Sequence, residues 1–184
     1  LGGQNLLYYL SSKLYASNPL LTSALALCNP FGMGTTEYEQ SKFYKDILVN
    51  SLKRWVKRNE APYRQFESSP LGISRHFSLE DTYKAIDIFD FDNKFTKKLM
   101  GIKDVKLEYY QRYAISGDRL QYIHIPTLIF HSQDDPVVTY LDVPVQDAKN
   151  NPNLIVVQSS QGGHCVFAEA KWGIIPRTYA FTER

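Results

Sequence analysis

Two apolar runs of strand length, each ending in a group of polar residues, constrain this chain more than any other feature. The first run covers residues 126–131 and leads into Asp134 and Asp135. The second covers residues 153–158 and leads into His164. Continuous apolar runs bounded by turn residues are typical of parallel strands that are buried on both faces. Because such runs alternate with helical segments along the chain, the sequence predicts an α/β fold with a parallel sheet.

The first part of the chain, residues 1–36, carries a single charged side chain, Lys13. Apolar residues recur at helical spacing along residues 4–14, which predicts a helix with one apolar face. A further apolar run at 20–28 is closed by an Asn-Pro turn and predicts another strand buried on both faces.

The middle of the chain, residues 37–117, is rich in charges that are interleaved with tyrosine and phenylalanine. Helical spacing of apolar residues predicts helices over 43–56, 79–87, 92–100 and 105–115. We interpret the charges as solvated helix faces. The whole chain is then one partial domain with three parts, residues 1–36, 37–117 and 118–184.

Composition excludes several classes of protein. The 184 residues are 43% hydrophobic, which is enough to bury a core and too much for an intrinsically disordered chain. A net charge of +2 without a basic block argues against nucleic-acid binding. No apolar run approaches the ~18 residues of a membrane-spanning helix. The two cysteines, Cys28 and Cys165, lack the neighbours of a zinc motif or disulfide framework, so we expect no metal or redox cofactor.

The order of the polar residues suggests a catalytic pair. In open α/β sheets, functional groups gather at the carboxyl ends of the strands, and an acid followed by a histidine is the order of a hydrolase triad. In such a triad the acid orients the imidazole, which deprotonates a nucleophile. Each residue also has a simpler interpretation, because Asp135-Pro136 is a common turn and Gly163-His164 could be a flexible surface loop.

The first residues suggest where the nucleophile lies. A nucleophile elbow reads G-x-S-x-G, with the serine on a sharp turn between a strand and a helix. The opening Leu1-Gly2-Gly3, followed at once by an apolar helix, is what should come after that serine. We therefore expect the serine immediately before Leu1, whose backbone N–H then donates to the oxyanion hole. A glycine-rich helix start without chemistry is the alternative.

Taken together, these segments resemble the carboxyl-terminal half of an α/β-hydrolase of the YheT-type, embryogenesis-associated serine esterase family. The resemblance rests on segments that follow one another in the order of that family: Leu1-Gly2-Gly3-Gln4-Asn5, Asn29-Pro30-Phe31, Phe89-Asp90-Phe91-Asp92, Tyr109-Tyr110, Ile125-Pro126-Thr127-Leu128-Ile129, Asp134-Asp135-Pro136 and Gly162-Gly163-His164.

The resemblance implies a serine hydrolase that cleaves carboxylic esters of lipid or medium-chain acyl character. It makes His164 the general base and Asp135 the orienting acid, since the family places the acid just before a Pro-Val-Val-like segment, with Asp134 as the competitor. Residues 37–117 correspond to a helical cap over the acyl pocket, although helices simply packed on the sheet would read similarly. Cys165, next to the base, is expected to be a buried neighbour and not a nucleophile.

The resemblance also implies a partner within the same protein. The nucleophile, the second oxyanion donor and several strands would lie in an amino-terminal half before Leu1, which is also where a membrane anchor would have to lie. The alternative is a catalytically inactive hydrolase-like module that serves as a scaffold in a larger assembly. A purely helical partner-binding protein is disfavoured by the strand runs.

Overall fold

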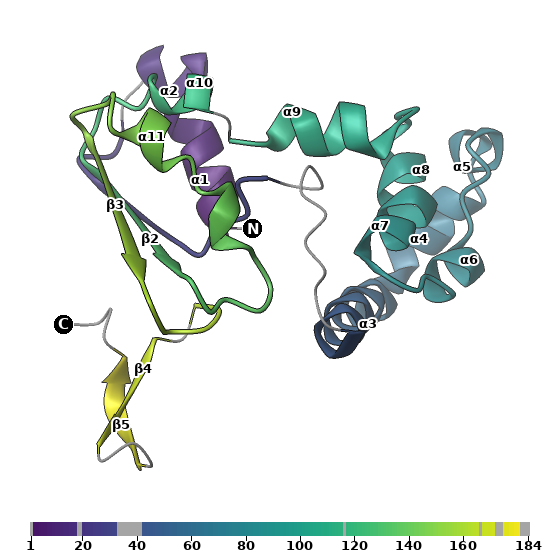
Figure 1. The fold of residues 1–184 in the computed structure, drawn as a ribbon. Coiled ribbons are helices and arrows are strands. Elements are labelled where there is room, and N and C mark those ends of the chain that lie inside the picture. Colours follow the sequence, from purple (N-terminus) through teal and green to yellow (C-terminus); the bar gives the residue numbers. More distant parts are fainter. Residues whose placement is uncertain are drawn as a thin grey trace. The chain divides into compact units, whose positions relative to one another are not determined.

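The chain forms two compact units, each of which has its own hydrophobic core (Figure 1). A computed structural model describes residues 2–17, 20–32, 42–115, 117–165, 167–171 and 175–180. The first unit combines Leu1–Tyr38 with Tyr113–Arg184, and the second is the intervening segment Glu39–Arg112.

The first unit contains a parallel sheet, which confirms the predicted α/β fold. The order of its three strands is β1-β2-β3, and both neighbouring pairs are parallel. Strands β2 and β3 lie side by side in Figure 1. The strands are β1 (Ala24–Leu27), β2 (Thr127–Ser132) and β3 (Leu154–Ser159). The helical elements are α1 (Gly2–Leu10), α2 (Lys13–Ser17), α10 (Gly117–Leu120), η3 (Tyr140–Asp142) and α11 (Val145–Ala148), and an antiparallel pair, β4 (Ala168–Lys171) and β5 (Ile175–Ala180), follows.

The two faces of the parallel sheet differ in burial. Ala26 and Ile129 are adjacent in register and are both buried in the core that α1 completes. Leu25 and Ile155 flank β2 on the opposite face, where they are 46% and 62% exposed. The expectation that the run at 20–28 forms a strand buried on both faces is therefore wrong, because Leu25 of β1 is exposed.

Helix α1 is shorter than the predicted helix over 4–14, and local hydrogen bonds explain why. The hydroxyl groups of Ser11 and Ser12 donate to the carbonyl oxygens of Tyr8 (3.1 Å) and Tyr9 (2.6 Å). Serine side chains that bond to the nearby backbone compete with helix continuation. Ser12 Oγ also accepts from the N–H of Tyr15 (3.2 Å), and it thereby stabilises the start of α2.

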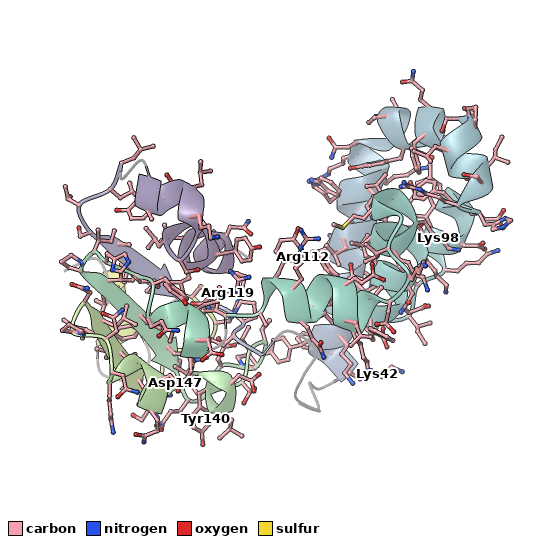
Figure 2. The ribbon with its side chains drawn as sticks, turned by 90° about the horizontal axis from the view of Figure 1, so that it is seen from above. Lys42, Lys98, Arg112, Arg119, Tyr140 and Asp147 are labelled. Atoms are coloured by element: carbon pink, nitrogen blue, oxygen red, sulfur yellow. The ribbon has the colours of Figure 1, made fainter. Side chains whose placement is uncertain are left out.

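The segment before β2 is anchored to this core on two sides. The guanidinium carbon of Arg119, labelled in Figure 2, lies 4.4 Å from the centroid of the Tyr8 ring. Arg119 precedes Leu120, which is fully buried in the core of the first unit. Asn151 Nδ2 donates to the carbonyl oxygens of Leu120 (2.7 Å) and Ile123 (2.9 Å), which ties this segment to the start of β3.

A pair of leucine substitutions tests this description of the core. Leu120→Ala is expected to lower the free energy of unfolding by about 2–5 kcal/mol, because it removes buried methyl groups and leaves a cavity. Leu141→Ala is the matched control, since Leu141 is 71% exposed and its loss should cost no more than about 0.5 kcal/mol. Urea unfolding of the full-length protein measures both, and equal costs would contradict the assignment of the core.

Among its described residues, the second unit contains helices joined by turns, and no strand. Its helices are α3 (Lys42–Arg58), α4 (Glu60–Glu67), α5 (Pro70–Ser74), α6 (Leu79–Tyr83), α7 (Ile88–Phe91), η1 (Asp92–Thr96), α8 (Lys97–Met100), η2 (Lys106–Tyr110) and the start of α9 (Gln111–Tyr113). The helix predicted over 79–87 ends early because Asp87 accepts from the N–H of Asp90 (2.7 Å) and starts α7 instead.

Two residues from the family segments meet in this second unit. The hydroxyl of Tyr110 donates to Asp92 Oδ2 at 2.6 Å, and both side chains are buried. Burial raises the pKa of Asp92, and the hydrogen bonds from Thr96 and Tyr110 only partly oppose that effect. This pair therefore fastens η1 to η2 within the unit.

In the described part of the chain, none of the helices combines the length and apolar character needed to span a membrane.

Candidate active site

The carboxyl ends of the three parallel strands bring distant polar residues to one edge of the sheet. Cys28 follows β1, Asp134 and Asp135 follow β2, and His164 lies in the loop after β3. Because the strands are adjacent and parallel, their carboxyl ends lie side by side. The predicted acid and the predicted base therefore reach each other although they come from separate loops.

Asp135 and His164 form a direct hydrogen bond. Nδ1 of His164 lies 2.8 Å from Oδ2 of Asp135. The side chain of Asp135 is fully buried, whereas that of His164 is 36% exposed. Since an ionised carboxylate only accepts hydrogen bonds, the imidazole donates its Nδ1–H, and Nε2 is then the atom that can accept a proton.

The second oxygen of Asp135 is held by the backbone that follows it. Oδ1 accepts from the N–H groups of Val137 (2.8 Å) and Val138 (3.0 Å). Burial of the carboxylate opposes its ionisation, but the hydrogen bonds from His164 and the two valines outweigh burial and lower the pKa of Asp135 below its usual 3.8. The buried group is thus an oriented anion directed at the imidazole.

The neighbouring carboxylate, Asp134, has different partners. Its Oδ1 accepts from the backbone N–H of Gly163 (2.8 Å) and from the hydroxyl of Ser132. The hydrogen bond from Ser132, followed by that from Gly163, lowers the pKa of this exposed carboxyl. Asp134 therefore fastens the loop that carries His164, whereas Asp135 contacts the imidazole itself.

The backbone of the histidine loop depends on Gly162. Its φ angle is +153°, and a Cβ at this position would lie 2.3 Å from the ring of Phe167. Phe167 is buried and packs edge-on against Phe130 of β2, with ring centroids 4.7 Å apart. A side chain at residue 162 would therefore push against the core beneath the loop.

Both cysteines of the chain lie at this site, in left-handed backbone with φ angles of +44° for Cys28 and +62° for Cys165. Burial raises the pKa of the Cys28 thiol to about 12, and burial also raises the pKa of Cys165. Neither is thus activated as a nucleophile. The expectation that Cys165 is a buried neighbour is wrong, because its side chain is exposed. Its loop places residue 165 at the surface, while Phe167 turns into the core.

Sequence reasoning missed the convergence of the cysteines with the histidine. The two sulfurs and a ring nitrogen of His164 lie within 4.8 Å of one another. No spacing motif joins Cys28 to Cys165, so the sequence showed no cluster of metal ligands. The run of apolar residues that ends at Cys28 was the available signal, because the carboxyl ends of neighbouring parallel strands meet at one edge of a sheet. The predicted oxyanion donor, Leu1, lies outside the described residues.

The ionised state of Asp135 predicts a pH dependence of stability. A carboxyl whose pKa is lower in the folded protein stabilises it above the unfolded value of 3.8, and that contribution is lost as the pH falls through the lower folded-state pKa. Asp135→Asn should therefore be less stable than the wild type near neutral pH, and the difference should shrink below pH 3.8. Urea unfolding of both proteins across this range measures the difference. A constant difference down to strongly acid pH would contradict the prediction.

The fold and this strand-end site define the class of protein. The family model of the alpha/beta hydrolase fold matches residues 1–171 of the chain. The chain belongs to this family, and curated relatives named lipase, phospholipase and esterase show that it is related to ester hydrolases.

Individual relatives indicate which branch of the family the chain resembles. The embryogenesis-associated protein EMB8 of Picea glauca is 28% identical over 89% of this chain and 35% of its own length. Phospholipase ABHD3 of Homo sapiens is 30% identical over 100% of this chain and 42% of its own length. The YheT protein of Escherichia coli (strain K12) is 28% identical over 90% and 46%, respectively. The resemblance to the YheT-type, embryogenesis-associated branch is confirmed, and the chain spans less than half the length of each of these relatives.

Proposed function

We propose that the protein is a serine ester hydrolase in which Asp135 and His164 are the acid and the base of a Ser-Asp-His triad. The observation that carries the proposal is the 2.8 Å bond from His164 Nδ1 to the buried carboxylate of Asp135, at the carboxyl ends of adjacent parallel strands. A scaffold has no need of a buried anion directed at a half-exposed imidazole. The nucleophilic serine of the proposal immediately precedes Leu1.

The chemistry follows from the tautomer that Asp135 selects. With the proton on Nδ1, the free Nε2 accepts the serine proton while the serine oxygen attacks the ester carbonyl carbon. The imidazolium that forms is stabilised by the Asp135 anion, and it then donates its proton to the departing alcohol. Water hydrolyses the acyl-enzyme by the same two proton transfers. The backbone N–H of Leu1 is the proposed donor to the oxyanion.

The proposed substrates are esters with lipid or medium-chain acyl groups. Support comes from the names of the relatives and from the second unit, whose chain leaves the sheet after β1 and returns before β2. We propose that this helical unit acts as a cap over the acyl group. It corresponds to residues 37–117, the middle part of the chain in the sequence analysis. Exposed apolar side chains on α3, Phe43 and Ile47, together with Leu71 on α5, are suited to contact an acyl chain.

Fluorophosphonate labelling of the full-length protein tests this function. The activated serine oxygen attacks phosphorus and displaces fluoride, so the serine of a working triad becomes covalently labelled. Peptide mapping by mass spectrometry should find the label on a serine in the peptide joined to Leu1.

The control is His164→Ala, in which labelling of that serine should slow by orders of magnitude because the base is missing. Recovery of the same peptide without label, while a known serine esterase in the same sample is labelled, would favour the alternative of an inactive hydrolase-like module. Label on Cys165 or on another serine would show that the triad is assigned incorrectly.

A further inference from the structure

We propose that Cys28, Cys165 and His164 form a binding site for Zn²⁺ whose occupancy inhibits the hydrolase. The three residues come from the ends of β1 and β3, and one donor atom of each lies within 4.8 Å of the others. Two sulfurs and one imidazole nitrogen are a donor set that Zn²⁺ prefers, and three protein ligands leave the fourth tetrahedral position for water.

The geometry needs only a small contraction to hold the ion. Ligands at about 2.0–2.3 Å from a tetrahedral Zn²⁺ lie roughly 3.3–3.8 Å apart, so the donors must approach by about 1 Å. Each cysteine already contacts the loop that carries the other one. The Cys28 sulfur lies 3.9 Å from the carbonyl oxygen of Gly163, and the Cys165 sulfur lies 3.9 Å from that of Leu27. Cys165 is exposed, so its side chain has room to move.

Asp135 completes the arrangement as an outer partner. A metal-binding histidine in proteins almost always donates its other ring N–H to a carboxylate or carbonyl, which orients the ring and raises its basicity. The bond from His164 Nδ1 to Asp135 already supplies this contact if the ion takes Nε2. If the ion takes Nδ1 instead, it replaces that bond.

Either way of binding removes the base. Zn²⁺ occupies an imidazole lone pair, and the two thiols release their protons as they bind, so that one Zn²⁺ replaces two protons at the site. Without a free Nε2 held by Asp135, the serine has no proton acceptor. The inhibitory consequence rests on the proposed function, whereas binding of the ion does not.

Cobalt titration of the full-length protein, reduced and freed of metal, tests binding without any assay of activity. Co²⁺ should bind at one ion per chain through these residues and produce the near-ultraviolet charge-transfer absorption of a cobalt–thiolate bond. Excess Zn²⁺ should abolish the absorption. Cys28→Ser and Cys165→Ser should each weaken binding by at least about 100-fold, the upper limit for loss of an outer partner alone.

Two further variants separate this site from adventitious binding. If the ion takes Nε2, Asp135→Asn should weaken Co²⁺ binding by about 10–100-fold, as expected for loss of an outer partner, whereas an ion on Nδ1 should not show this loss. His124→Gln changes an exposed histidine outside the cluster and should leave the titration unchanged. The proposal would be overturned by absorption that persists in both cysteine variants or that is absent from the wild type. It would also be overturned if the two thiols form a disulfide under the reducing conditions used.

Ester hydrolysis then tests the inhibition. The ratio of rates with and without Zn²⁺ should fall well below one in the wild type, recover on addition of a chelator, and return close to one in Cys165→Ser. Comparing ratios within each variant removes differences in their basal rates. Cobalt binding without any esterase activity would refute the proposed function and leave the metal site standing, whereas activity without cobalt–thiolate absorption would refute the metal site alone.

Discussion

Replacing His164 with alanine is expected to lower kcat for ester hydrolysis by about 10⁴–10⁶-fold, because in the proposed triad His164 is the base for the serine and the proton donor for the departing alcohol. KM should change little, since the imidazole acts on the reacting atoms and not on the acyl chain. The side chain of His164 is 36% exposed and forms a hydrogen bond with Asp135, so the fold should survive its removal. Steady-state kinetics on a chromogenic acyl ester with the full-length protein measures the effect.

The matched control is His124→Ala, at an exposed histidine just before β2. It should retain kcat within about a factor of two, since a surface substitution away from the site is close to neutral. Equal losses of kcat in the two variants would indicate misfolding. Nearly full activity in His164→Ala would show that His164 is not the base.

Asp135→Asn is expected to lower kcat by about 10⁴-fold, because an amide favours the wrong imidazole tautomer and does not stabilise the imidazolium. Asp134→Asn is the informative comparison, since it changes the adjacent carboxylate in the same way. Asp134 contacts the N–H of Gly163 and not the imidazole, so its substitution should loosen the loop and cost far less.

The relative sizes of the two losses in kcat distinguish these two roles. A large loss in Asp134→Asn together with a mild one in Asp135→Asn would reverse the assignment of the acid.

The strands next to the site were predictable because their sequence signal is local. The runs predicted at 126–131 and 153–158 correspond to β2 (Thr127–Ser132) and β3 (Leu154–Ser159), each displaced by one residue. The strand predicted from the run at 20–28 was less accurate, since only Ala24–Leu27 is strand. The apolar residues predicted a strand in this segment, but hydrogen bonding to β2 decides which of the residues belong to it.

The errors concern quantities that depend on neighbours distant in sequence. Ile155 and Leu25 are apolar strand residues, yet they are exposed, whereas Phe130 on the same face of the sheet is buried against Phe167. Cys165 was expected to be buried, from the resemblance to the family, but it is exposed, and the buried side chain near it in the loop is Phe167. Residue type alone does not specify which face of a loop meets the core.

The sequence by itself determined the class of fold, the family and the identity of the acid and histidine candidates, because strand runs, turn residues and their order are properties of contiguous segments. Only the tertiary structure gave the contact between His164 and Asp135, the acid that the resemblance had favoured over Asp134, and only it brought Cys28 and Cys165 close to that histidine. The physical reason is the parallel pairing of β1, β2 and β3, which brings the ends of three segments far apart in the chain within hydrogen-bonding reach.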